Sequence, residues 1–283
     1  MSATTITDSP LSTAVVRPRR SLLARALFGL AVVLGSAIGS AYLLHASIDP
    51  AEDTAVTQTR NENLAGLASW AFLPGASNAA DLAASHYDLI VVDEPLGAAS
   101  NVAPRASTLA VLGLKPDGER RLVLARLSAD ADLEALERIV RQGFAGIQLY
   151  RGSGHADAMT SDPDARAELI GRIERMAQYA REKVPGFMVV LEDAESLLDS
   201  PRVRKTIDAV AKRNLLYTGR ADEKPNDADA VATSVAALKR AQRDGVPVLV
   251  VETLGNDAAV ASARDRLFNF GFTPYIATRT LAN

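Results

Sequence analysis

The residues best placed for chemistry in this chain are carboxylates that stand at or just after the ends of short apolar runs. They are, in chain order, Asp93, Glu94, Glu192, Asp193 and Glu252. Two carboxyl groups can hydrolyse a glycosidic bond, because one protonates the leaving oxygen while the other acts as nucleophile or base. These acids are therefore the residues from which a catalytic pair would be drawn.

Another apolar run, at 146–149, ends in Tyr150 rather than in an acid. A tyrosine at the end of a strand is most often a packing or hydrogen-bonding residue, although its hydroxyl can act as a nucleophile on a sugar. The acids have a structural alternative as well, since they can pair with nearby basic residues. Those residues are Arg126, Arg151 and Arg213. A neighbouring cation favours the ionised carboxylate, so such pairing would oppose proton donation.

The sequence offers little support for other kinds of site. The histidines His45, His86 and His155 lack metal-ligand spacing, and there is no cysteine. The chain contains no Gly-x-Ser-x-Gly elbow, P-loop or Gly-x-Gly-x-x-Gly motif, so neither a serine hydrolase nor a nucleotide site is indicated. A formal net charge of -3 over 283 residues gives no electrostatic basis for binding nucleic acid. We therefore expect no metal, no cofactor and no nucleic-acid partner.

From residue 68 onward, short apolar runs alternate with helical patterns. The runs are typical of parallel strands buried on both faces, because polar and apolar residues do not alternate within them. We predict strands at 69–73, 87–93, 121–128, 146–150, 187–192, part of 207–217, 246–252 and 274–278. We predict helices at 133–141, 163–183, 227–243 and 257–270. Eight strands alternating with helices predict an α/β fold of the (β/α)8, or TIM, barrel class, with a doubly wound open sheet as the alternative.

In a (β/α)8 barrel the carboxyl ends of the strands form the ligand-binding face. Residues at those ends, and in the loops that follow, are therefore the predicted lining of a ligand-binding cleft. The predicted set is Trp70, Asp93, Glu94, Arg126, Ser128, Asp130, Tyr150, Arg151, Glu192, Asp193, Arg213, Tyr217 and Glu252.

The N-terminal part of the chain differs in composition from the rest. Residues 1–20, rich in Ser and Thr and ending in arginines, predict a disordered tail. The apolar run that follows predicts a transmembrane or signal-anchor helix at 21–48, and 49–67 predicts a polar linker. Because the arginines precede the run, we expect the N-terminus in the cytoplasm and the domain at 68–283 on the periplasmic or extracellular side of the inner membrane. Cleavage as a signal peptide, followed by secretion, is the alternative.

Several segments, in their order and spacing, carry a resemblance to a known family. They are Trp70 to Phe72, Ser85 to Asp93, Arg121 to Ser128, Gln142 to Gly146, Pro185 to Glu195, Ile207 to Val210, Gly245 to Glu252 and Gly271 to Ala277. Taken together they resemble glycoside hydrolase family 114, the endo-α-1,4-polygalactosaminidase-like TIM barrels. The resemblance implies a barrel that hydrolyses α-1,4-linked galactosamine polymers with two carboxylates at strand ends.

The chain departs from the family pattern at the positions that the resemblance marks as catalytic. Tyr150 stands where the family has one carboxylate, and Arg213 stands where it has the other. The loop after Ser128 lacks the long Trp-rich segment usual in the family and leads directly into a helical pattern. These departures imply that the scaffold is kept while the catalytic pair is lost.

We therefore expect a membrane-anchored barrel that binds or helps to handle an exported, galactosamine-type polysaccharide without hydrolysing it, with proteins of the cell envelope as further partners. One alternative is an active glycosidase whose acids are relocated to Glu192, Asp193 or Glu252. The other alternative is an interaction scaffold of the cell envelope that binds no saccharide.

Overall fold

The computed structural model describes residues 64, 67–73, 82–93, 106–151 and 162–278. The chain divides into two compact units, Met1–Asp53 and Thr54–Asn283, and all the described residues belong to the second unit. The predicted tail and anchor, at 1–20 and 21–48, lie outside the described residues, as does Glu94. Among the residues that are described, no helix is both long and apolar enough to cross a bilayer.

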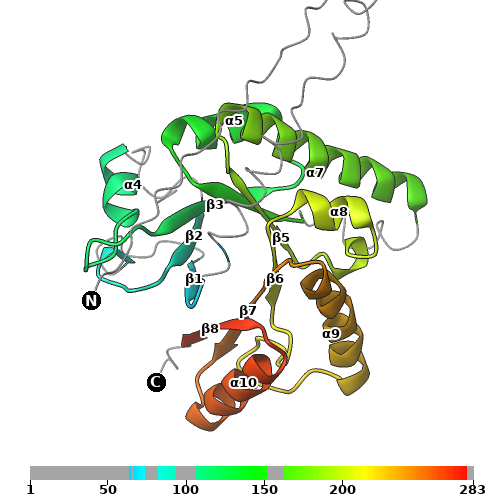
Figure 1. Cartoon of the computed structure of the whole chain (residues 1–283). Coiled ribbons are helices and arrows are strands. Elements are labelled where there is room, and N and C mark those ends of the chain that lie inside the picture. The colour runs from blue at the N-terminus through cyan, green and yellow to red at the C-terminus, as the bar shows by residue number, and fades with distance from the viewer. Residues whose placement is uncertain (1–63, 65–66, 74–81, 94–105, 152–161, 279–283) are drawn as a thin grey trace, which may run out of the picture. The chain divides into compact units, whose positions relative to one another are not determined.

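Eight parallel strands, hydrogen-bonded in the order of the sequence, nearly close into a barrel (Figure 1). They are β1 (Trp70–Leu73), β2 (Leu89–Asp93), β3 (Leu122–Ser128), β4 (Gly146–Tyr150), β5 (Met188–Glu192), β6 (Ala209–Arg213), β7 (Val248–Leu254) and β8 (Thr273–Thr278). Each predicted strand overlaps one of these. Consecutive parallel neighbours throughout are the topology of a (β/α)8 barrel and differ from a doubly wound sheet, in which the strand order reverses.

Helices connect the strands and lie outside the sheet (Figure 1). The described ones are α4 (Ala106–Leu112), α5 (Leu133–Gln142), α7 (Pro163–Lys183), α8 (Pro201–Thr206), α9 (Ala228–Arg243), α10 (Asp257–Asn269) and the 3-10 turn η1 (Glu195–Leu197). The four predicted helices match α5, α7, α9 and α10. Helices α4, η1 and α8 are not predicted from the sequence, because segments of seven residues or fewer complete at most two turns and show too little periodicity to be recognised.

The four long helices begin at side-chain caps. Asp132, Asp162, Asp227 and Asn256 each accept a hydrogen bond from a backbone N–H in the first turn of the helix that follows. Such a cap satisfies a donor that has no partner within the helix and contributes about 1 kcal/mol. The helices therefore start at positions that the sequence itself encodes.

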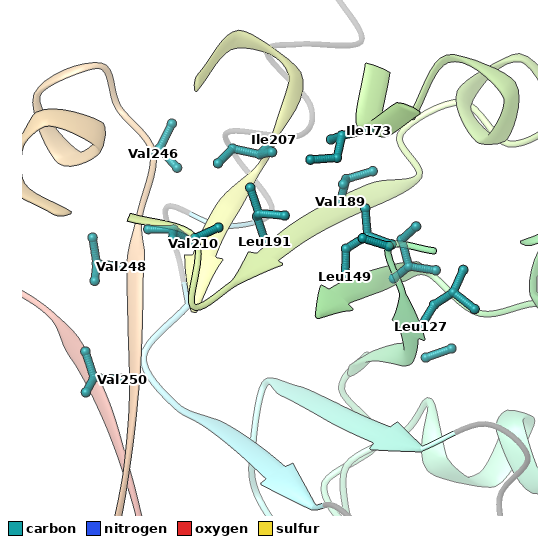
Figure 2. Packing of buried hydrophobic residues seen from close by; sticks show 14 of the residues in the cluster. Leu127, Leu149, Ile173, Val189, Leu191, Ile207, Val210, Val246, Val248 and Val250 are labelled. Carbon is teal, nitrogen blue, oxygen red and sulfur yellow. The ribbon is translucent and has the colours of Figure 1, made fainter. Parts of the chain in front are cut away.

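The strands separate two apolar layers. Side chains such as Leu149, Val189 and Leu191 face outward and pack in one buried cluster with Ile173 of α7 (Figure 2). Alternate residues on the same strands point into the barrel and form a second cluster, which includes Trp70, Leu89, Leu124, Met188, Val190, Ala211 and Val251. Burial on both faces explains why the strands appear in the sequence as continuous apolar runs.

The barrel interior is narrow at β4. A Cβ atom added to Gly146 would lie 2.6 Å from the Cβ of Met188 on the adjacent strand and closer still to the Met188 carbonyl oxygen. Only glycine fits such an approach without moving the backbone of β5. Gly146 thereby sets the spacing between two strands whose last residues contribute to the candidate site.

The first and last strands are joined by side chains. The indole Nε1 of Trp70 donates a 3.0 Å hydrogen bond to the carbonyl oxygen of Thr273, and its ring lies 6.1 Å from that of Tyr275. Among the described residues, no backbone ladder joins β8 to β1. Trp70 therefore acts as the link across this seam, at the amino-terminal end of both strands.

Candidate functional site

The candidate site is formed by inward-facing residues at the carboxyl ends of β2 to β6. Side chains alternate along a strand, so a residue two positions after an inward-facing residue also faces inward. Each residue of the site lies two positions after a member of the interior cluster, or after a residue in register with such a member. These residues are Asp93, Arg126, Gln148, Glu192 and Arg213. They replace the apolar interior with charge at one end of the barrel, and we call them the rim cluster.

Glu192 is the centre of the rim cluster and is 1% exposed. Arg126 donates to both carboxylate oxygens, Nε to Oε2 and Nη2 to Oε1, each over 3.0 Å. The amide Nε2 of Gln148 donates to Oε2 over 2.7 Å, and Nε of Arg213 lies 2.7 Å from Oε1. A carboxylate has about four lone-pair positions for accepting hydrogen bonds. The basic and amide groups around Glu192 therefore occupy all of its acceptor positions.

Asp193 holds Arg213 in place beside Glu192. Its Oδ1 accepts a 2.9 Å hydrogen bond from the backbone N–H of Arg213, and its Oδ2 accepts one from Arg213 Nε over 3.0 Å. The backbone of Asp193 has a φ of 49°, in the left-handed region that Asp tolerates better than most residues. This local strain turns the chain after β5 so that consecutive acids bind the same arginine.

Arg126 fills the space between β1, β4 and β5. Its guanidinium lies 3.9 Å from the ring centroid of Tyr150 and 5.3 Å from that of Phe72, and it is 3.7 Å from Oδ1 of Asp93. Burial lowers the pKa of Arg126, but the contacts with Glu192, Asp93 and Tyr150 outweigh burial and leave the pKa raised. Arg126 is thus a permanent cation, and Tyr150 serves as its stacking partner.

Lys212 lies on the outward face of β6, one residue before Arg213, and pairs with acids from the loop after β5. Its Nζ is 2.8 Å from Oε1 of Glu195 and 3.3 Å from Oδ1 of Asp193. Burial lowers the pKa of Lys212, and these two carboxylates more than reverse that effect. Asp193 therefore has a basic partner on each face of β6.

Glu252 is buried on the outward face of β7 and is not part of the rim cluster. It alternates with Val251, which faces the barrel interior, and it is 0% exposed. Burial raises its pKa to about 7, although the backbone N–H groups of Leu216 and its neighbours and the charge of Lys212 act in the opposite direction. A pKa near neutrality is typical of general acids, but this carboxyl group is sealed beneath the loop after β6, where Leu216 N donates to Oε1 over 2.7 Å.

The remaining predicted lining residues occupy different places. Trp70 lies at the amino-terminal end of β1, opposite the rim cluster. Tyr217 is buried in the outward cluster and pairs with Pro225 through a backbone bridge. Ser128, at the end of β3, accepts a hydrogen bond from the Asp130 backbone N–H over 3.2 Å. Arg151 follows β4 and is partly buried.

Gln148 and Lys212 belong to this network although neither is among the residues predicted from the sequence to line the cleft. A polar residue inside the run 146–149, with Tyr150 two positions later on the same face, is the signal that could have identified Gln148. Its Oε1 atom is buried without a hydrogen-bond partner among the described residues. In that part of the chain, no group of three or more His, Asp or Glu side chains is arranged to hold a metal ion.

Comparison with known proteins shows a fold shared with glycoside hydrolases. The glycoside hydrolase domain of PelA from Pseudomonas aeruginosa superimposes with a TM-score of 0.55 at 16% identity, covering 75% of this chain and 95% of that domain. A GH18 chitinase from Pseudoalteromonas aurantia superimposes with a TM-score of 0.50 at 10% identity, covering 75% of this chain and 94% of the chitinase. At these identities the likeness shows a shared barrel fold.

Comparison by sequence finds similarity to two uncharacterized bacterial proteins. One from Deinococcus radiodurans is 27% identical over 149 residues, which cover 53% of this chain and 47% of that protein. One from Thermotoga maritima is 24% identical over 159 residues, covering 52% of this chain and 48% of that protein. The chain spans about half the length of these curated relatives. No protein-family model matches it.

Proposed function

We propose that this protein binds a polysaccharide at the rim cluster and does not hydrolyse it. The observation that carries the proposal is the saturation of Glu192 by Arg126, Arg213 and Gln148. Glycoside hydrolysis requires a carboxylic acid that can give up a proton and a second carboxylate that can attack the sugar or activate water. A carboxylate whose oxygens already accept N–H groups, and which is 1% exposed, has no lone pair to offer.

The other acids near the rim support the same conclusion. Asp193 is engaged by Arg213 and Lys212, and Asp93 lies beside Arg126. Glu252 has a pKa suited to proton transfer but faces away from the barrel interior. Glu192, Asp193 and Asp93 are thus each paired with a cation, and the outward-facing Glu252 has no access to a sugar placed at the rim.

Support for a saccharide ligand comes from the fold shared with glycoside hydrolase domains and from the exposed parts of the rim cluster. The side chain of Arg213 is 42% exposed, so its guanidinium group can reach sugar hydroxyls. The resemblance to family 114 places a galactosamine-type polymer among the polysaccharides to be tested. We further propose that the segment 21–48 anchors the barrel to the inner membrane, with the rim cluster outside the cytoplasm and proteins of the envelope within reach.

A binding and hydrolysis experiment on the purified full chain tests the proposal. Affinity electrophoresis against a panel of polysaccharides, including partially acetylated α-1,4-galactosamine polymer and polygalacturonate, measures retardation, and a reducing-end assay on the same polymers measures cleavage. We expect retardation by at least one polymer and no new reducing ends. Cleavage that disappears when Glu192, Asp193 or Glu252 is changed to Ala would establish the glycosidase instead. Absence of retardation by every polymer would favour an interaction scaffold.

A further inference from the structure

We propose that Arg213 selects the ligand, by binding a carboxylate substituent through the terminal nitrogens of its guanidinium group, so that the polysaccharide taken at the rim is an acidic one. This inference rests on the proposed function and narrows it to one chemical class of saccharide. It depends on how Arg213 is held, on how much of it is exposed, and on which groups at the rim are already paired.

Arg213 is held through one end of its guanidinium group. Nε lies 2.7 Å from Glu192 Oε1 and 3.0 Å from Asp193 Oδ2, while the backbone N–H of Arg213 donates to Asp193 Oδ1. Within the described part of the chain, the hydrogen bonds that Arg213 donates to other residues come from its backbone N–H and from Nε, and none comes from Nη1 or Nη2. The side chain is nevertheless 42% exposed. Its terminal nitrogens are therefore fixed in direction by the buried end and remain open to a ligand.

A fixed guanidinium group with open terminal nitrogens matches a carboxylate. Two parallel N–H donors can bind the two oxygens of one carboxylate, and such charge-assisted pairs are stronger than hydrogen bonds to a neutral hydroxyl. Because Glu192 and Asp193 already order the long side chain, binding a ligand costs less conformational entropy than it would for a free arginine. Arg126, by contrast, donates hydrogen bonds to Glu192 from Nε and Nη2, and its side chain is only 16% exposed.

The same pairing makes the rim a poor receptor for an amino sugar. An ammonium group needs a carboxylate with free lone pairs, and both oxygens of Glu192 and of Asp193 already contact basic or amide groups. Asp93, whose side chain is 40% exposed, lies 3.7 Å from Arg126. An amine that approached Asp93 would also approach that cation.

Three tetrasaccharides with one backbone separate these possibilities. α-1,4-Linked oligomers of galacturonate, N-acetylgalactosamine and galactosamine share configuration and linkage and carry negative, zero and positive charge. Titration of each into the purified full chain by calorimetry should give the tightest binding for galacturonate, by about tenfold or more over N-acetylgalactosamine, as expected for a hydrogen-bonded charge pair. In Arg213→Gln this preference should vanish, because the affinity for galacturonate should fall by about tenfold more than the affinity for N-acetylgalactosamine.

Arg213→Lys is the matched control, since it keeps the charge beside Glu192 and Asp193 but loses the paired donors. We expect it to retain part of the galacturonate preference, and the thermal midpoint of each variant shows whether the fold persists. Galactosamine binding that is tightest and is lost in Asp93→Asn would overturn the assignment. Equal loss of all three sugars in Arg213→Gln would also overturn it, by showing that the residue is only structural. Binding of none of the three, together with no retardation in the polysaccharide panel, would overturn the proposed function as well.

Discussion

The buried carboxyl group of Glu252 should make the stability of the domain depend on pH, and replacing it with an amide should remove that dependence. Burial raises the pKa of Glu252 from 4.5 to about 7. The folded state therefore holds the proton more tightly than the unfolded state. Stability from this group is fully present below about pH 4.5 and declines as the pH rises to about 7, where the folded protein also loses the proton.

The size of the effect follows from the shift in pKa. One pH unit corresponds to about 1.4 kcal/mol, so a rise from 4.5 to about 7 amounts to about 3 kcal/mol of unfolding free energy. Glu252→Gln keeps an oxygen that can accept the Leu216 N–H but carries no titrating proton. The variant should match the natural protein near pH 4.5 and exceed its stability by about 3 kcal/mol at pH 8.

Urea unfolding at a series of pH values from 4.5 to 8, followed by circular dichroism, measures this difference. The two proteins share every other titrating group, so the difference between their curves isolates Glu252. Glu182→Gln, at an exposed position on α7, controls for the loss of one surface charge. A difference between the Glu252→Gln variant and the natural protein that stays constant across the series would refute the reasoning.

Two further predictions concern the barrel itself. Gly146→Ala should destabilise the domain by about 3 kcal/mol, because the added methyl group would meet the Met188 backbone and Cβ. Gly171→Ala, in the middle of α7 where only the flexible end of an arginine side chain is near, should instead stabilise it by up to about 1 kcal/mol; urea unfolding of the two variants tests this contrast in sign. Trp70→Phe should lower stability by about 2 kcal/mol, since it removes the hydrogen bond to Thr273 and part of a buried ring. A thermal midpoint unchanged in this variant would show that the seam does not depend on that bond.

The strands and long helices could be predicted because their physical causes are local. The apolar run from Gly146 to Leu149 and the capping aspartate before α5 are visible within a few residues of sequence. The inward or outward direction of each side chain was not visible in the same way. In a strand buried on both faces, Val251 and Glu252 occupy equivalent places in the run, and only the packing of β7 between its neighbours decides which of them enters the barrel.

Four of the five rim residues could be placed at strand ends from the sequence, but the ion pairs and hydrogen bonds among them could not. Arg126 and Glu192 each stand out as a charged residue at or near the end of an apolar run, yet they are 66 positions apart. Their pairing depends on the register of β3, β4 and β5. The role of Gln148 could not be predicted for the same reason, since its hydrogen bond to Glu192 spans 44 positions. The predicted anchor at 21–48 lies outside the described residues and stays a prediction.

The seam at Trp70 has a consequence for the order of folding. Every strand pairs with its immediate neighbour in sequence, so the sheet can grow by adding one strand and helix at a time, and each step brings together segments much closer in sequence than the two ends of the domain. The bond from Trp70 to Thr273 is different, because it spans 203 positions and cannot form until β8 is in place. We infer that contact between β1 and β8 is the last to form during folding and the first to break during unfolding. The barrel should therefore open transiently between these two strands.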